Sequence, residues 1–415
     1  ITPPRDTILM DDIMPSVTKE NRKSAILKAL FMPRKKLIES VGGNPNADID
    51  TLATIVFSSG SEGTPKGVML SHYNLTKNIE SCMQVFPISK GGDCVMGMLP
   101  FFHVLGSMGT LWYPMTQPNV RVTFHPNPTE SRVIGKLMAN HKVTMLFSTS
   151  TLLQGFIRRC PAEQLEALNY VMTGAEKLSP RVRVAFNEKF GVEPLEGYGT
   201  TECSPAVSLN LPDFVAPGFY QKGSKHGTIG HPIPGVSVRI QDSETGKILE
   251  NNQTGLLYVK GPNIMDGYLK EPKRTAKVLK DGWYETGDIA MIDDDGFITI
   301  TDRLARFSKI AGEMVSHTKV EESLHNVLGM TETLLSVAGV SDEAKGERIV
   351  VLHTLSDAQL DDLLARMDES GLPNLWRPKR NSFYRINEIP VLPNGKLDLS
   401  TIKSRAAKLA GGLES

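Results

Sequence analysis

Short apolar runs alternate with amphipathic segments between residues 52 and 260, and this alternation leaves few architectures open to the chain. Residues 143–147 and 170–172 have the composition of buried strands, while residues 180–190 follow a helical pattern. Strands that alternate with helices pair most economically as a parallel sheet with helices packed on its faces. We therefore predict an α/β part over residues 1–226.

The pattern changes over residues 227–302, where short strands are separated by Gly, Pro and Asn turns. The expected strands cover residues 228–230, 236–240, 255–259 and 297–300, with a hairpin turn at 293–296. This pattern favours a small antiparallel, β-barrel-like subdomain attached to the α/β part. Residues 1–302 would then form one large N-terminal domain.

A smaller α+β domain is expected over residues 307–415. Its predicted helices cover residues 319–328 and 357–367, and its predicted strands cover residues 348–352 and 382–386. A length of about 110 residues is usual for a small domain. We therefore predict two domains of unequal size.

The composition indicates a globular protein without a strong net charge. Hydrophobic residues make up 40% of the 415 residues and charged residues 22%, and 46 Lys and Arg balance 46 Asp and Glu. No global field therefore recruits nucleic acid or an anionic membrane, and we predict no nucleic-acid partner.

Cysteine spacing and hydropathy bear on the compartment. The four cysteines lie far apart without a C-x-x-C pair, which argues against a zinc site or a disulfide framework and favours a reducing, cytoplasmic compartment. No apolar run reaches the roughly 18 residues of a membrane span. Because the chain begins at Ile1 without a signal-peptide pattern, we expect it to start inside a longer protein. A missing upstream region could then hold it peripherally at the inner face of the cell membrane.

A loop rich in hydroxyl groups and glycine follows the apolar run at residues 54–57. Its residues 58–67 include one lysine, Lys66, and such a turn can bring backbone N–H groups and a cation to phosphates. It does not fit the Walker P-loop, G-x-x-x-x-G-K followed by Ser or Thr, because Pro65 precedes Lys66 and Gly67 follows it. Pro65 also places Lys66 on a mobile loop and not at a helix start. Alone, the loop is either a phosphate cradle or a plain turn.

Five further segments carry residues that suit a nucleotide. They are residues 173–176, 196–202, 283–288, 302–313 and 393–396. Glycines allow close backbone approach, Tyr198 offers a stacking face, Glu202 can hold Mg²⁺ and Asp288 suits a ribose diol. Each site has a structural alternative: Glu202 as the cap of a helix near Pro205, Asp288 as a turn residue, and Lys396 as a solvated surface lysine.

Taken together and in this order, the six segments resemble those of the adenylate-forming enzymes, which include acyl-CoA synthetases, peptide-synthetase adenylation domains and luciferases. The likeness runs from about Thr51 to the end of the chain. Residues 196–203, 260–265 and 307–316 look most like the acyl-acyl carrier protein (acyl-ACP) synthetase part of the bifunctional acyltransferase/acyl-ACP synthetase. The resemblance implies a mobile C-terminal lid domain, with residues 303–306 as its hinge.

The resemblance implies a two-step ligase that uses ATP and Mg²⁺. A carboxylate would attack the α-phosphate to give an acyl-adenylate and pyrophosphate, and a thiol would then take the acyl group and release AMP. The thiol would belong to acyl carrier protein or, alternatively, to CoA. This chemistry depends on positioning and cationic groups more than on a base, because a carboxylate is already ionised at pH 7.

The resemblance also implies roles for individual residues. The phosphates would be bound by Ser58, Ser59, Gly60, Ser61, Gly63, Thr64 and Lys66. Adenine and ribose would be bound by Gly174, Ala175, Glu176, Gly197, Tyr198, Gly199, Asp288 and Arg303. The catalytic residues would be Lys396, Thr201 and Glu202, with Glu202 as the metal ligand, and the thioester-forming face would include Lys309 and Gly312.

An acyl pocket is expected at and after residues 100–103. Its predicted lining is His103, Val104, Met108 and Trp112. Because no lysine or arginine interrupts residues 104–115, we predict a medium- or long-chain fatty acid as the substrate. His103 is alternatively a core histidine. The basic residues 377–380 are a candidate docking patch for an acidic carrier protein, or a solvated face.

Three features depart from the family pattern. Asp302 stands where the family has a glycine, and Ala305 stands where the hinge usually has Asp or Lys. Only 57 residues precede Ser58, where the family has about a hundred more. These departures keep open a rival of another class, a nucleotide- or lipid-binding module without turnover.

Overall fold

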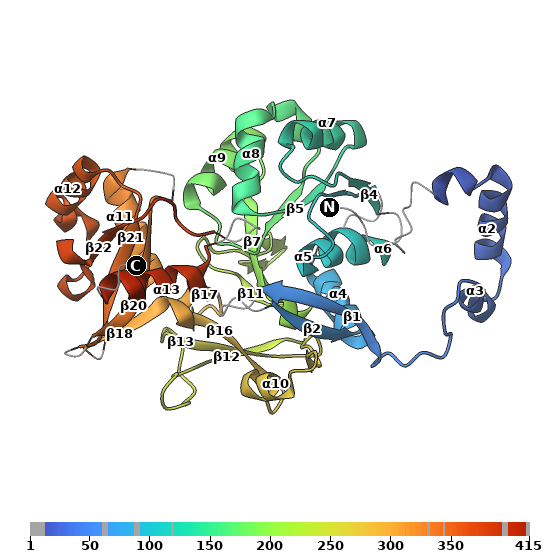
Figure 1. Cartoon of the computed structure of the whole chain (residues 1–415). Helices are drawn as coiled ribbons and strands as arrows, with labels where there is room; N and C mark the ends of the chain where they lie inside the picture. Colours follow the sequence, from blue (N-terminus) through green and yellow to red (C-terminus); the bar gives the residue numbers. More distant parts are fainter. Residues whose placement is uncertain are drawn as a thin grey trace. The chain divides into compact units, whose positions relative to one another are not determined.

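A computed structural model (Figure 1) describes residues 13–59, 65–86, 92–117, 120–311, 313–329, 333–342, 345–391 and 397–411. Contacts divide the chain into two compact units, residues 1–51 and 52–415. The first unit contains the 3₁₀ helix η1 (Met14–Ser16) and the helices α2 (Lys19–Phe31) and α3 (Arg34–Ser40). The domain boundaries proposed from the sequence remain predictions.

The second unit is built on a seven-stranded sheet in the order β11-β8-β7-β6-β5-β3-β4. Its strands are β3 (Cys94–Gly97), β4 (Arg121–Phe124), β5 (Met145–Ser148), β6 (Tyr170–Thr173), β7 (Pro194–Gly199), β8 (Ala206–Leu209) and β11 (His231–Pro232). Strands β3 to β7 pair in parallel, and β8 and β11 add antiparallel pairs at one edge. All residues of β3 and β5 are buried, as expected for parallel strands covered on both faces. The predicted parallel α/β architecture is confirmed.

Helices cover both faces of this sheet. On one face lie α7 (Ser131–His141), α8 (Ser150–Arg159) and α9 (Pro180–Phe190), which stand together in Figure 1 and pack on the sheet through Ile134, Phe156 and Phe186. The other face is covered by α4 (His72–Val85), α5 (Val104–Ser107), the π-helical turn η2 (Met108–Trp112) and α6 (Tyr113–Met115). Helix α9 has the bounds that the sequence pattern predicts.

The strand predicted at residues 228–230 is wrong. Strand β11 begins at His231, and Gly230 has a φ of +79°, which an extended strand cannot contain. The Thr228 hydroxyl donates a hydrogen bond to the carbonyl of Lys225 at 2.8 Å. Residues 225–230 therefore form a turn that leads into the sheet.

Two antiparallel sheets make up the β-rich part. The larger has the order β12-β13-β16-β15, with β17 on β16. Its strands are β12 (Ser237–Gln241), β13 (Gly255–Lys260), β15 (Leu279–Lys280), β16 (Trp283–Ile292) and β17 (Ile298–Arg303), and helix α10 (Pro272–Val278) precedes β15. The hairpin predicted at residues 293–296 joins β16 to β17.

The smaller sheet brings distant segments together. Strand β1 (Leu52–Ser59) pairs with β2 (Pro65–Ser71), and β2 pairs with β14 (Gly267–Tyr268). Lys66 therefore lies in a strand, opposite Ser58, and the prediction that it sits on a mobile loop is wrong. Pro65 excludes the helix, but the pairing of β2 with β1 holds the lysine in an extended chain.

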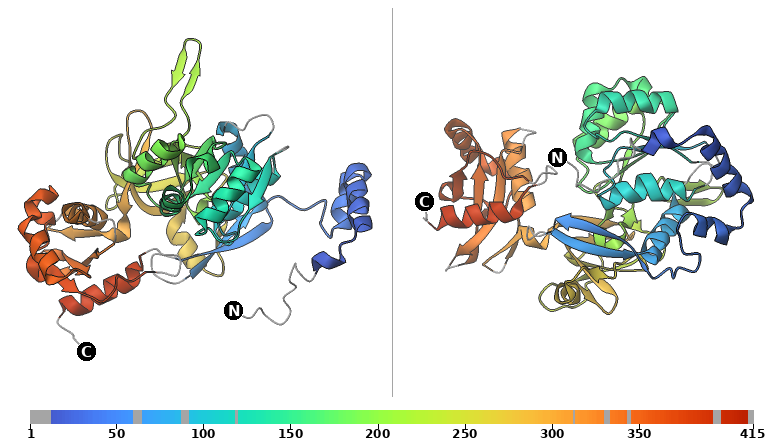
Figure 2. Two further views of the ribbon diagram at one scale, coloured as in Figure 1. Left: turned by 90° about the horizontal axis from the view of Figure 1, so that it is seen from above. Right: turned by 45° about the vertical axis from the view of Figure 1, so that its right-hand side comes forward.

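A separate hairpin follows strand β8. Strands β9 (Phe214–Ala216) and β10 (Phe219–Gln221) pair with each other and, in the part of the chain that is described, with no other strand. In the left panel of Figure 2 this yellow-green hairpin projects from the rest of residues 52–415.

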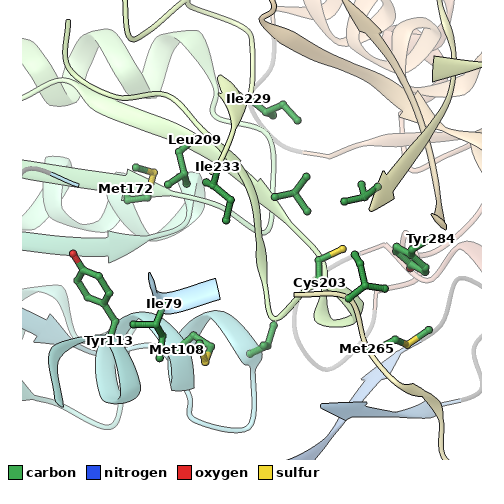
Figure 3. Close-up of a cluster of buried hydrophobic side chains, with 14 of the residues drawn as sticks. Ile79, Met108, Tyr113, Met172, Cys203, Leu209, Ile229, Ile233, Met265 and Tyr284 are labelled. Atoms are coloured by element: carbon green, nitrogen blue, oxygen red, sulfur yellow. The ribbon is translucent and has the colours of Figure 1, made fainter. Parts of the chain in front are cut away.

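One apolar cluster joins the parallel sheet to the β-rich part. Figure 3 shows Met172 of β6 and Leu209 of β8 in the same buried cluster as Met265 and Tyr284 from the β-rich part. Because this shared core fixes the carboxyl ends of β6 and β7 against β14 and β16, side chains from all four strands can meet in one site.

Residues 307–411 form an α+β structure around a five-stranded sheet, β19-β18-β21-β20 with β22 on β21. Its elements are β18 (Phe307–Ile310), β19 (Glu313–Ser316), α11 (His317–Leu328), β20 (Leu335–Asp342), β21 (Gly346–His353), α12 (Asp357–Ala365), β22 (Phe383–Arg385) and α13 (Leu399–Ala410). Separate apolar clusters pack α11 and α13 on the sheet. The predicted helices and strands of this region are confirmed to within two residues at each end.

His317 makes this region sensitive to acid. The side chain is buried, with Nε2 2.8 Å from Ser308 Oγ, and burial together with Arg306 and Lys403 lowers the pKa of His317 to about 3. As pH falls below about 6.5 the unfolded chain binds a proton that the folded chain does not, so the free energy of unfolding falls by about 1.4 kcal/mol per pH unit. We expect His317→Gln to remove this part of the slope in urea unfolding between pH 6.5 and 5. His141→Gln, at an exposed histidine, should leave the slope unchanged.

Candidate nucleotide site

A cavity of 1470 Å³ opens at the carboxyl ends of β6 and β7, where ligands bind in parallel α/β sheets. Its walls come from residues 56–58, 65–66, 102–105, 172–175, 197–202, 205–206, 209, 268, 270–274, 277–278, 284–287, 303–304 and 397–400. The lining mixes backbone of glycine-rich turns with charged side chains and an apolar wall. This is the composition of a site that orients a polar ligand through a few fixed groups.

The cavity collects many of the residues that the sequence singled out. Those on its wall are Ser58, Lys66, His103, Val104, Gly174, Ala175, Gly197, Tyr198, Gly199, Thr201, Glu202 and Arg303. Asp288 is buried directly behind Tyr198 and Arg303, to which it is hydrogen-bonded. Segments more than 200 residues apart thus meet at one place, although the role of each residue remains a prediction.

Other predicted site residues lie elsewhere. The Glu176 carboxylate accepts hydrogen bonds from Thr151 N at 2.5 Å and Thr151 Oγ1 at 3.1 Å, at the start of α8, and does not line the cavity. Met108 is in the apolar core and Trp112 is exposed. Lys309 forms an ion pair with Glu244. Gly60, Ser61, Gly63, Thr64, Gly312 and Lys396 lie outside the described residues, and Ser59 is described only as the end of β1.

Lys66, Glu202 and Tyr268 form a closed triangle on the cavity wall. Lys66 Nζ lies 2.6 Å from Glu202 Oε1, and the Tyr268 hydroxyl donates to the same oxygen at 2.8 Å. Lys66 Nζ also lies 2.8 Å from the Tyr268 hydroxyl oxygen and 4.6 Å from the centre of its ring. Strands β2 and β14 and the 3₁₀ turn η4 (Thr201–Cys203) each supply one corner. Three separate elements therefore fix the position of one carboxylate.

Glu202 is ionised although only 5% of its side chain is exposed. Burial acts to raise its pKa, but the Lys66 ammonium and the hydrogen bonds from Lys66 and Tyr268 outweigh burial, so the pKa of Glu202 lies below its usual value. Burial and the Glu202 charge raise the pKa of Tyr268, which stays a hydrogen-bond donor. The site thus keeps a buried anion and a cation side by side, each able to turn to an incoming charged ligand.

The Glu202 carboxylate fits a Mg²⁺ ion that is shared with a ligand. Mg²⁺ prefers oxygen ligands and is commonly held by one or two carboxylates together with phosphate oxygens and water. Among the described residues no group of three or more His, Cys, Asp or Glu side chains could form a metal site from protein alone. One carboxylate on the wall of a large cavity therefore suits a metal that is bound mainly through ligand oxygens.

A second polar cluster surrounds Asp288. Arg303 Nε donates to Asp288 Oδ1 at 3.0 Å, and the Tyr198 hydroxyl donates to Oδ2. Strands β16 and β17 place Asp288 opposite Arg303. Burial raises the pKa of Asp288, and Arg303 and Tyr198 oppose this effect only in part. A carboxylate held between two donors at a cavity wall can exchange one of them for a hydroxyl of a bound ligand.

The structural alternatives considered for Glu202, Asp288 and His103 are wrong. Strand β8 begins at Ala206, so Glu202 does not cap a helix near Pro205. Asp288 lies within the ten-residue strand β16 and not in a turn. His103 lines the cavity, with Nδ1 accepting from Leu105 N at 3.3 Å, and is not a core residue.

Sequence reasoning missed Tyr268. A single tyrosine after Gly267 gives no signal of its own. Only the pairing of β14 with β2, which sets Tyr268 opposite Val68, brings it to Lys66.

The Ser58 hydroxyl lacks a partner within the described residues. Its Oγ is buried and makes no hydrogen bond there. A buried hydroxyl without a partner at a cavity wall favours a ligand that supplies one.

The fold and the cavity define a nucleotide-sized site in an α/β enzyme-like architecture, and comparison with known proteins identifies the family. The sequence profile described as AMP-binding enzyme matches residues 5–269. The chain belongs to this family, within the adenylate-forming superfamily that its motifs resemble. The acyl-ACP synthetase resemblance remains a prediction.

Relatives and solved structures agree with this assignment. The chain is 31% identical to a long-chain-fatty-acid–CoA ligase of Bacillus subtilis over 361 residues, covering 85% of this chain and 61% of the relative. It is 30% identical to 4-coumarate–CoA ligase 1 of Arabidopsis thaliana over 390 residues, covering 91% and 66%. The chain therefore spans less than two thirds of the length of these relatives.

Solved structures of other proteins share the fold. ATP-bound MatB from Rhodopseudomonas palustris aligns with a TM-score of 0.75 and 24% identity, covering 90% of this chain and 73% of that one. The o-succinylbenzoate CoA synthetase of Bacillus subtilis, in complex with its acyl-adenylate, aligns with a TM-score of 0.72 and 24% identity, covering 86% and 70%.

In the described part of this chain no helix has the length and hydropathy needed to cross a membrane.

Proposed function

We propose that the chain is the catalytic part of an ATP-dependent acid ligase that joins a fatty acid to AMP with release of pyrophosphate. The observation that carries the proposal is the cavity with two polar clusters, Lys66–Glu202–Tyr268 and Tyr198–Asp288–Arg303. The first has the charges for a phosphate chain and its metal, and the second has the donors and carboxylate for a ribose. Membership of the AMP-binding enzyme family supports a nucleotide as the ligand.

The chemistry follows from charge placement. An ionised carboxylic acid needs no base, so the chain has to bring two anions together and balance the charge that develops at the α-phosphate. Lys66 can turn from Glu202 to phosphate oxygens, and Thr201 lies on the same wall. Mg²⁺ at Glu202, when bound, would neutralise phosphate charge. Lys396, the predicted catalytic lysine, belongs to the same proposal, although it lies outside the described residues.

The apolar part of the cavity supports a fatty acid. Val104, Leu105, Ala206 and Leu209 contribute to this wall, beside His103. Several relatives carry the name long-chain-fatty-acid–CoA ligase. An aliphatic chain would bury its surface there while its carboxylate faces the phosphate cluster.

We propose CoA as the acceptor thiol, in line with the names of the relatives. Acyl carrier protein stays a prediction from the sequence resemblance. The candidate patch on this chain for docking the carrier protein, residues 377–380, is partly neutralised. Arg377 pairs with Asp368 at 2.5 Å, and Arg380 pairs with Asp361 at 2.7 Å. Paired arginines offer less attraction to an acidic partner.

ATP–pyrophosphate exchange tests the proposal. We expect medium- and long-chain fatty acids to stimulate exchange by about tenfold or more over 4-coumarate or amino acids, and Lys396→Ala to abolish it. Transfer of the acyl group to CoA and to carrier protein, measured side by side, identifies the acceptor. ATP binding without exchange under any acid would instead favour the rival, a binding module without turnover.

A further inference from the structure

The β9–β10 hairpin exposes large apolar side chains. Phe214, Val215, Phe219 and Tyr220 are 57%, 73%, 55% and 62% exposed. Figure 2 shows the hairpin standing clear of the neighbouring strands of its unit. Single exposed apolar residues are common on protein surfaces. Four neighbouring ones on a projecting element indicate an interaction surface for a protein or a membrane.

The four side chains cover both faces of the hairpin. Tyr220 pairs with Val215 and Phe219 pairs with Ala216, so Val215 and Tyr220 share one face. Phe214 and Phe219 share the other face, with ring centres 6.0 Å apart in an edge-to-face arrangement. No charged side chain occurs from Phe214 to Tyr220, and Pro217 and Gly218 form the turn. The tip is therefore apolar all round.

Hydrogen bonds at its base hold the hairpin in this shape. Asp213 Oδ1 accepts from Gly223 N at 2.9 Å and Oδ2 accepts from the Tyr220 hydroxyl at 2.6 Å. Leu211 N donates to the carbonyl of Gly223 at 2.9 Å. A Cβ at Gly223 would lie 2.4 Å from the carbonyl oxygen of Pro212, so this closure requires glycine. The exposed side chains thus sit on a supported element.

The base is anchored to the sheet that carries the cavity. Asn210 Nδ2 donates to the carbonyls of Glu196 and Thr228 at 2.9 and 2.6 Å, and Asn210 Oδ1 accepts from Lys225 N at 3.0 Å. The preceding strand β8 ends at Leu209, which lines the cavity. The hairpin is therefore a fixed extension of a cavity strand.

We propose that the β9–β10 hairpin inserts its tip into the surface of a lipid bilayer. A flat protein partner would cover one apolar face and leave the other in water, whereas acyl chains surround both. The outer edges of a two-stranded hairpin carry unpaired N–H and C=O groups, so the tip goes no deeper than the boundary between headgroups and acyl chains. At this depth Tyr220 and Lys222 lie at the level of the lipid headgroups. The Tyr220 hydroxyl keeps its hydrogen bond to Asp213 there.

Sedimentation with vesicles of phosphatidylcholine and phosphatidylglycerol tests the proposal. The double variant Phe214→Ser, Phe219→Ser should bind the vesicles about tenfold more weakly than the unchanged chain, because two large apolar side chains no longer enter the bilayer. Raising the salt concentration should change binding little, since apolar contact dominates. The matched control Val184→Ser, Ile248→Ser removes two exposed apolar side chains outside the hairpin and should leave binding unchanged.

A reporter at the tip completes the test. Tryptophan fluorescence of Val215→Trp should shift to the blue on addition of vesicles, and the thermal midpoint of the double serine variant should equal that of the unchanged chain. Equal sedimentation of the double variant would overturn the proposal. So would a dimer that the double variant dissociates without any vesicle binding. Because no ATP or acid is present, a negative result leaves the proposed ligase function untouched, and loss of that function leaves this proposal standing.

Discussion

Glu202→Gln is expected to lower the rate of fatty-acid-dependent ATP–pyrophosphate exchange by about 100-fold, or about 2.7 kcal/mol in the barrier. Glutamine keeps the shape of the side chain and can still accept from the Tyr268 hydroxyl, but it removes the anion that faces Lys66 at 2.6 Å. A metal ion would lose its only proposed protein ligand. The loss should therefore fall on kcat and on the Mg²⁺ concentration needed for half-maximal rate, with a smaller change in KM for ATP.

Two other variants separate charge from geometry at this site. Tyr268→Phe keeps the ring beneath Lys66, 4.6 Å from Nζ, but removes the hydroxyl, so we expect a loss of about three- to tenfold. Glu322→Gln breaks an exposed ion pair with Lys177 and should change the rate less than twofold. Exchange by Glu202→Gln within about threefold of the unchanged chain would rule out Glu202 as the metal ligand.

In the proposed site, the buried ion pair would stabilise Lys66 and Glu202 without a ligand and still let both bind one. Unpaired, a carboxylate as buried as Glu202 would be costly to keep ionised, and Lys66 supplies the missing positive charge. As proposed, a metal–nucleotide complex would bring both a cation for Glu202 and anionic oxygens for Lys66. The two charges can then exchange partners without either being left alone, so binding need not overcome the full cost of breaking the pair.

The sequence predicts the parallel sheet well because the strands β5 and β6 are short and mostly apolar, a composition that favours a buried strand over other structures. It also predicts which segments carry polar chemistry. It could not predict the contact of Lys66 with Tyr268, because that contact depends on β14, about two hundred residues later. Contacts between strands that are distant in sequence are set by packing, which local patterns do not record.

Packing that local patterns do not record also explains other differences between the predicted and the observed positions of site residues. The apolar spacing around Met108 and Trp112 suits a pocket wall as well as a core helix, and the structure buries the first and exposes the second. Glu176 follows β6 as predicted, but its carboxylate turns to the backbone of Thr151 at the start of α8, where N–H groups lack partners within the helix. The β9–β10 hairpin was not predicted, since its three-residue strands are too short for an alternating pattern.

Asp288→Asn is expected to lower kcat/KM for ATP by about 100-fold while changing kcat by only a few-fold. In the proposed orientation Asp288 accepts from a ribose hydroxyl. The neutral amide of asparagine accepts more weakly, and its NH₂ group faces one of the two donors, Tyr198 or Arg303. The effect should therefore appear in KM for ATP. Because burial already raises the pKa of Asp288, losing its charge removes a desolvation cost, and we expect little loss of stability.

Deoxynucleotides make this prediction specific. A carboxylate that binds a ribose hydroxyl should give the unchanged chain a higher kcat/KM for ATP than for 2′-deoxy-ATP or 3′-deoxy-ATP. Asp288→Asn should bring the ratio of these kcat/KM values towards one. Asp281→Asn, at an exposed residue before β16 with a φ of +52° that asparagine tolerates, should keep both the rate and the preference. If Asp288→Asn lowers kcat/KM equally for all three nucleotides, Asp288 positions Tyr198 and Arg303 and does not contact the ribose. Glu202→Gln, by contrast, should lower the rate with every nucleotide and leave the preference intact, so the pair of variants assigns the phosphate end and the ribose end of the cavity separately.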